Sequence, residues 1–192
     1  MTTRLDFLCS AATAGLRAGA FPTADEPLDV KGRTAAARLT GSSQGYATIL
    51  TSPARCAKET AESMELQATP EPALRDCDFG RWAGRPLAKI GAEEAEALAL
   101  WLSDPEAGPH GGESFAQVKI RVGRWMDAIP ENFGAVLAIT HAAVMRAAIV
   151  HALGAPALSL LHIDVAPLGR ARLSRAGGVW RFGGLMPAKD GR

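Results

Sequence analysis

The sequence predicts an α/β protein, a three-layer α/β/α sandwich with a mainly parallel central sheet. Short apolar runs alternate along the chain with longer segments that have helical spacing. Such alternation favours parallel strands, because each helix carries the chain back across a face of the sheet. The length of 192 residues suits one domain, which we expect to cover residues 1–192.

The expected strands are short and bounded by turn-forming residues. Four apolar runs have the length of buried strands: Leu5–Leu8, Ala47–Leu50, Val136–Ile139 and Leu160–Val165. A fifth run, "VWRFGGL", is a candidate edge strand. Helical patterns occupy residues 28–40, 55–66, 86–103, 113–129 and 142–153. The segment from about 76 to 112, rich in Gly, Pro and Trp, predicts an insertion or lid beside the sheet.

Composition excludes several classes of function. The net charge is +1 and the 21 basic residues are dispersed, so we expect neither a nucleic-acid partner nor a membrane surface. No apolar run approaches the roughly 18 residues of a membrane span, and we expect a cytoplasmic protein. The odd number of cysteines, Cys9, Cys56 and Cys77, predicts reduced thiols and no disulfide framework.

Two of the predicted strands end in residues that could bind an anion. After the second strand, Ser52 and Pro53 precede a helix whose first turn contains Arg55. Helix N-terminal amides and a guanidinium together form an anion site, although a surface arginine in salt bridges is the simpler interpretation. After the third strand, His141 opens a helix, and a capping histidine without chemistry is the alternative.

Carboxylates lie in the loops between these strands. Asp76 and Asp78 flank Cys77 before a glycine turn, where they could be acid–base groups or turn formers. Glu113 and Ser114 follow two glycines at the start of a helix, a pattern that is also typical of a helix cap.

The order of these motifs carries more information than any one of them. "TSPARCAKETA", "LRDCDFGRWAG", "GGES" and "ITHAAVMRA" follow one another, and "EPLDVKGRTAAARL" precedes them. This arrangement, over residues 5 to about 182, resembles the histidine phosphatase superfamily. The resemblance implies the phosphoglycerate-mutase-like fold, in which the first strand normally ends in Arg-His-Gly, followed by a Thr.

The resemblance implies that the family's nucleophile is missing. Laid on this chain, the motif's Arg falls on Cys9, its nucleophilic His on Ser10, its Gly on Ala11 and its Thr on Thr13. A neutral imidazole attacks phosphorus readily near pH 7, whereas a hydroxyl needs a base to take its proton. The apolar strand therefore delivers a hydroxyl where the family delivers an imidazole.

The family's other parts map onto residues that are present. The resemblance implies that Arg55 is the second phosphate-binding Arg and that His141 contacts the phosphoryl oxygens. It also implies that Asp76, shorter than the usual Glu, protonates the leaving group, and that Glu113 and Ser114 lie near the substrate.

Two further residues could compensate for the lost arginine of the pocket. Thr13 and Arg17 are candidates for phosphate binding, with Arg17 replacing the lost guanidinium or remaining a solvated surface residue. Arg146 is expected to be a helix-surface partner. His141 could act as a base for Ser10, but beside bound phosphate it would be protonated, which suits oxyanion stabilisation instead.

The sequence thus predicts a protein that binds phosphate or a small phosphomonoester, with phosphatase chemistry impaired or lost. Two alternatives stay open: an active phosphatase with an altered nucleophile, and a non-catalytic structural or interaction protein. No cofactor is expected and no metal, because the cysteines include no C-x-x-C pair. A homodimer is possible.

Overall fold

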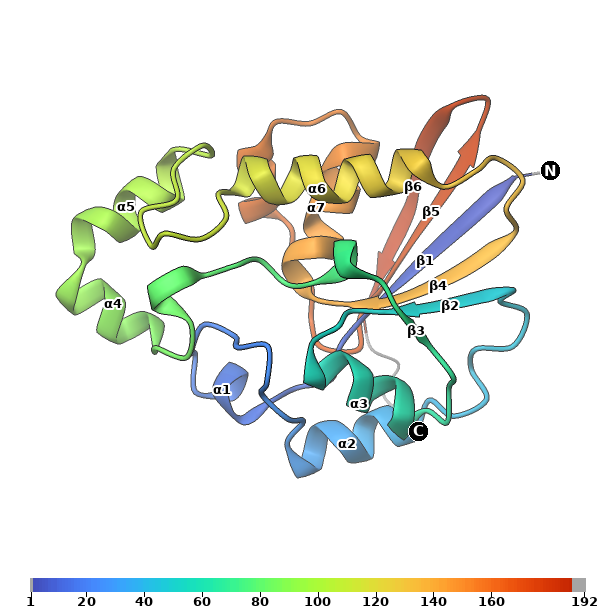
Figure 1. Ribbon diagram of the computed structural model, residues 1–192, viewed down its shortest axis with the longest axis horizontal. Coiled ribbons are helices and arrows are strands. Elements are labelled where there is room, and N and C mark those ends of the chain that lie inside the picture. Colours follow the sequence, from blue (N-terminus) through green and yellow to red (C-terminus); the bar gives the residue numbers. More distant parts are fainter. Residues whose placement is uncertain (1, 188–192) are drawn as a thin grey trace.

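The computed structural model describes residues 2–187, which form a twisted sheet between two layers of helices (Figure 1). The strands are β1 (Thr3–Cys9), β2 (Thr48–Thr51), β3 (Thr69–Pro70), β4 (Ala135–Thr140), β5 (Arg170–Ala176) and β6 (Val179–Met186). They form one sheet in the order β3-β2-β4-β1-β5-β6. Strands β3, β2, β4 and β1 are mutually parallel, while β5 runs antiparallel to both β1 and β6. The mainly parallel α/β/α sandwich is confirmed.

Each face of the sheet has its own apolar core, because side chains alternate along a strand. On β4, Val136 and Ala138 pack with α6 (Phe115–Ala128) and α7 (Ala142–Ala152). Leu137 and Ile139 pack on the opposite face with α2 (Val30–Ala37) and α3 (Arg55–Ser63). Figure 1 shows these two helix pairs on opposite sides of the strands.

The predicted strand at Leu160–Val165 is wrong. This segment forms the 3₁₀ helix η3 (Ala157–His162) and then irregular chain. The place beside β1 belongs to β5, whose buried Ala171 and Leu173 alternate with arginines and serine. The half-buried alternation of "RARLSRA" is a genuine strand signal, but its arginines hide it from a search for continuous apolar runs.

Residues 86–103 form two helices and not one. α4 (Leu87–Glu93) ends where Glu94 leaves helical geometry, at φ −137° and ψ 42°, and α5 (Ala95–Ser103) follows. The predicted helix 28–40 is shorter, and a one-turn helix α1 (Ala14–Arg17) and the short strand β3 were not predicted. The 3₁₀ helices η1 (Pro72–Leu74) and η2 (Gly80–Trp82) complete the described elements.

The α4–α5 segment is attached to the rest of the molecule by aromatic packing and by carboxylates, chiefly that of Glu94. Trp82 and Trp101 are buried and meet edge to face, with ring centroids 5.8 Å apart. The Glu94 carboxylate accepts hydrogen bonds from Trp82 Nε1 at 3.0 Å and from Arg85 Nη1 at 2.6 Å, and it also pairs with Arg81. These bonds hold the pKa of Glu94 at about 2. No helix among residues 2–187 is long and apolar enough to cross a membrane.

Candidate functional site

A cavity of about 260 Å³ opens at the carboxyl ends of β1 and β4, the edge at which parallel sheets bind ligands. The end of β1 supplies Cys9, Ser10 and Ala11 to its wall, and the following loop supplies Thr13. Further lining residues come from α3, the loops and the start of α7: Glu26, Cys56, Asp76, Phe79, His141, Ala142, Ala143 and Arg146.

The backbone holds Ser10 firmly at the end of β1. Its N–H donates to Thr140 O at 2.7 Å, and the next N–H, of Ala11, donates to Thr60 Oγ1 at 3.0 Å. The Ser10 hydroxyl lies 3.9 Å from the thiol of Cys56, and the residue is 8% exposed. Ser10 therefore occupies the tip of the central strand and faces the cavity, but no basic side chain is hydrogen-bonded to it in residues 2–187.

His141 is held between Ser52 and Asp76. Its Nε2 lies 2.8 Å from Ser52 Oγ, and its Nδ1 lies 3.5 Å from Asp76 Oδ2. We assign the proton to Nδ1, because that nitrogen faces the Asp76 carboxylate; Nε2 then accepts the proton of Ser52, whose oxygen in turn accepts the Ala54 N–H at 3.2 Å. Burial lowers the pKa of His141, which the charge of Asp76 opposes. The imidazole is therefore neutral near pH 7, and its basic nitrogen is already occupied.

Two arginines predicted to bind phosphate lie elsewhere. Arg55 is outside the set of residues that line the cavity; its Nε donates to Glu59 Oε1 at 2.8 Å and its side chain is 56% exposed. Arg17 pairs with Asp29 and is 52% exposed, as a solvated surface residue would be. The neighbour of Arg55, Cys56, faces the cavity instead, because successive helical residues point about 100° apart.

Position 56 is therefore the place in α3 where a guanidinium would reach an anion in this cavity. Position 9, where the resemblance places the motif's first arginine, and position 56 both hold thiols. Burial raises the pKa of Cys9 to about 12 and that of Cys56 to about 11, so neither is a thiolate near pH 7.

Ser114 is the helix cap that was its alternative, whereas Glu113 is held in ion pairs. Ser114 caps α6 in a reciprocal pair with Gln117. Glu113 accepts two hydrogen bonds from Arg121 at 2.8 Å, and neither it nor Ser114 lines the cavity. Asp78 accepts the N–H of Gly80 at 2.9 Å, as a turn former does. The structure thus brings Ser10, Thr13, Asp76 and His141 together, and leaves Arg17, Arg55, Glu113 and Ser114 outside.

Arg146 is the lining residue that sequence reasoning missed. It lies on α7 on the same helical face as Ala142 and Ala143, which also line the cavity. It follows Ala143 and Ala142 by three and four residues, and this helical spacing was the available signal. Within residues 2–187, no cluster of three His, Cys, Asp or Glu side chains could hold a metal ion.

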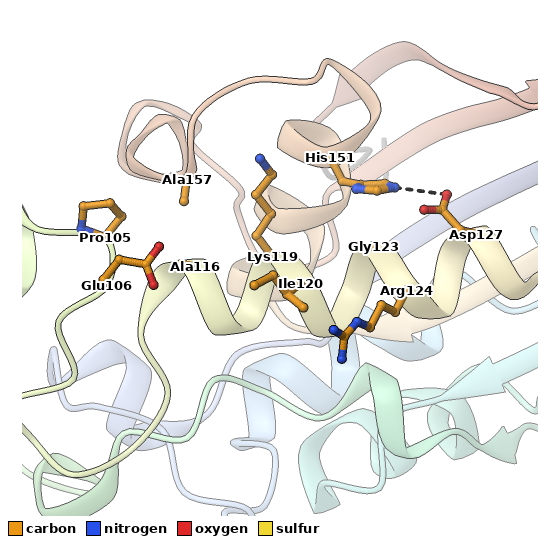
Figure 2. Close-up of a pocket in the computed structure, with 10 residues that line it drawn as sticks. All are labelled: Pro105, Glu106, Ala116, Lys119, Ile120, Gly123, Arg124, Asp127, His151 and Ala157. Carbon is orange, nitrogen blue, oxygen red and sulfur yellow. Dashed lines mark hydrogen bonds and ion pairs between the residues drawn. The ribbon is translucent and has the colours of Figure 1, made fainter.

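A larger hollow of about 540 Å³ lies along α6, far from the strand ends (Figure 2). Its polar side chains are largely paired within the protein: His151 Nε2 lies 3.1 Å from Asp127 Oδ1, and Lys119 Nζ donates to Ala155 O at 2.7 Å. Its walls therefore offer few free groups to a ligand, and the cavity at the strand ends is the better candidate site.

Comparison with known proteins agrees with this geometry. The model of the histidine phosphatase superfamily (branch 1) matches residues 12–185. The chain belongs to the histidine phosphatase superfamily. Among its superfamily relatives, it is 31% identical to the adenosylcobalamin/alpha-ribazole phosphatase of Salmonella typhimurium over 161 residues, which are 79% of this chain and 78% of that protein.

Two further relatives define how far the likeness extends. The bifunctional protein Rv2228c of Mycobacterium tuberculosis is 33% identical over 135 residues, 66% of this chain; the chain spans only 37% of that protein. The crystal structure of the alpha-ribazole phosphatase from Shigella flexneri superimposes with a TM-score of 0.85 at 23% identity, covering 98% of both chains. The latter likeness shows a shared fold.

Proposed function

We propose that this superfamily member binds phosphate or a small phosphomonoester in the cavity at the end of β1 and has lost most or all phosphoryl transfer. One observation carries the proposal: the wall that should present an imidazole presents the Ser10 hydroxyl, whose nearest side-chain partner is a protonated thiol. A hydroxyl attacks phosphorus only when a base removes its proton. His141 does not serve, because its Nε2 accepts from Ser52.

The expected loss is large. Removing the nucleophile of a well-studied serine protease lowers kcat on the order of 10⁶-fold, leaving the contribution of binding and oxyanion contacts. The cavity here also contains fewer cations than a phosphate site requires. Its charged side chains are Arg146, Glu26 and Asp76, so carboxylates outnumber guanidinium groups. We therefore expect weak, millimolar binding of a phosphate dianion and negligible turnover.

The active-phosphatase alternative is favoured by one observation, the survival of the His141–Asp76 pair on the cavity wall. In that case Asp76, in its protonated form, would donate to the leaving alcohol, and a phosphomonoester such as the alpha-ribazole phosphate of the relatives' names would be a reasonable substrate class. The wall at Phe79 comes from the segment 76–112, which would form the lid. Three buried free thiols are consistent with a cytoplasmic location.

Turnover and binding distinguish these functions. The protein is assayed for hydrolysis of p-nitrophenyl phosphate and ribose 5-phosphate, and phosphate binding is measured by isothermal titration calorimetry. Saturable binding without turnover supports the proposal. Turnover that is abolished in His141→Ala would show an active phosphatase. Neither turnover nor binding would leave a structural or interaction role, including that of a homodimer.

A further inference from the structure

The cavity wall contains one guanidinium, that of Arg146, to which the resemblance assigned no role. This residue is on the wall of the cavity with the ends of β1 and α3. Its charge opposes the rise in the pKa of the Cys9 thiol, which places the guanidinium near the tip of β1. Arg146 therefore lies close to the position from which the motif's own arginine has been lost.

The Arg146 side chain has unused hydrogen-bonding capacity. Its Nε is shielded from solvent and has no hydrogen-bond partner in the part of the chain that the structure describes. No ion pair joins it to a carboxylate within residues 2–187, whereas Arg17 and Arg55 each have one. A buried donor without a partner is costly, so an unpaired guanidinium on a cavity wall indicates a missing acceptor.

The start of α7 provides further donors beside Arg146. The helix begins after His141, and its first residues, Ala142 and Ala143, line the cavity. The first N–H groups of a helix have no partner within it and favour an anion. A guanidinium one turn further along the same face can bind a tetrahedral oxyanion together with those amides, since two of its N–H groups lie parallel.

We propose that Arg146, together with the N-terminus of α7, is the anion-binding element of this cavity and recognises phosphate or the phosphoryl group of a small monoester. This inference rests on the proposed binding function and names the residue that performs it. Arg146 supplies a positive charge to a cavity wall on which the thiols of Cys9 and Cys56 are neutral.

Phosphate titrations of Arg146→Gln test the assignment, with Arg55→Gln and Arg17→Gln as matched controls. Both controls remove a guanidinium from the same protein, but from outside the cavity. We expect Arg146→Gln to weaken binding of inorganic phosphate and phenyl phosphate about tenfold or more, the value of a charged hydrogen bond. The controls should change it less than twofold, and Arg146→Lys should retain part of the affinity.

Thermal unfolding of each variant shows whether it is folded, and Arg146→Lys provides a second variant if Arg146→Gln is not. Unchanged phosphate affinity in Arg146→Gln, with binding intact in the parent, overturns the inference but leaves the proposed function. An equal loss in Arg55→Gln also overturns it. A parent protein that binds neither phosphate nor phenyl phosphate overturns both.

Discussion

Acidification below about pH 6.5 should destabilise the folded protein through the buried imidazole of His141. An unfolded histidine titrates near pH 6.5. In the folded protein burial lowers the pKa of His141, and proton uptake at Nε2 would require the Ser52 hydroxyl to turn from donor to acceptor across the 2.8 Å contact. The unfolded chain therefore binds this proton more readily than the folded one. The free energy of unfolding is unaffected above about pH 6.5 and falls as the pH is lowered beneath it.

The size of the effect follows from proton linkage. One proton bound by the unfolded chain alone changes the free energy of unfolding by at most about 1.4 kcal/mol per pH unit. We therefore expect His141 to contribute up to about 1.4 kcal/mol of destabilisation between pH 6.5 and 5.5. Burial lowers the pKa of His110 as well, so its effect has the same sign. The lowered carboxylate pKa values of Glu94 and Glu113 matter only below about pH 4.5.

Urea unfolding at half-unit intervals from pH 7.5 to 5.5 measures the slope. His141→Gln should remove the contribution of one proton, and His110→Gln serves as the matched control for the second buried imidazole. Nitrogen-15 NMR of the imidazoles should show His141 as the neutral Nδ1–H tautomer at pH 7. A His141 that titrates at or above pH 6.5, with the same slope in His141→Gln, would refute the reasoning.

Three further outcomes follow from the same geometry. Ser10→His alone should restore little turnover of p-nitrophenyl phosphate. The triple variant Ser10→His, Cys9→Arg, Cys56→Arg should be at least about 10³-fold faster than this single variant, because a guanidinium stabilises a transferring phosphoryl group. Equal rates in the two variants would contradict this expectation. Cys9 and Cys56 should react far more slowly with iodoacetamide at pH 8 in the native protein than in urea, because their pKa values are about 12 and about 11. Gly112→Ala should lower the free energy of unfolding by about 1–3 kcal/mol in urea titrations, because the added Cβ would lie 2.0 Å from Asp78 O. Gly111→Ala is the control for this clash, because its Cβ meets nothing within 4 Å. The positive φ of Gly111 adds backbone strain to that control.

The strand ends were the most predictable part of the fold and of the site. An apolar run followed by "THAA" predicted both β4 and the place of His141 at the start of α7, and the structure has both. Asp76 was located by the glycine turn that follows it. These positions depend on where a strand ends and the next helix begins, and apolar runs and turn residues indicate such boundaries directly.

The direction of individual side chains could not be predicted as well. An error of one residue in α3 exchanges Arg55 for Cys56, and with it an exposed guanidinium for a thiol on the cavity wall. Arg146 was expected at the surface because helical spacing places it on the face of Ala142 and Ala143 but does not show that this face of α7 meets the cavity. Strand β5 was missed because its arginines, which pair with carboxylates and carbonyls near the edge of the sheet, conceal the alternating apolar pattern.

The Glu94 carboxylate secures the α4–α5 segment near the cavity wall. It fastens the junction of α4 and α5 to the turn around Trp82, close to the wall that Phe79 provides. With a pKa of about 2, the Glu94 carboxylate remains charged throughout the physiological pH range. Because these bonds are made to an ionised carboxylate, the junction of α4 and α5 keeps its attachment over that whole range of pH.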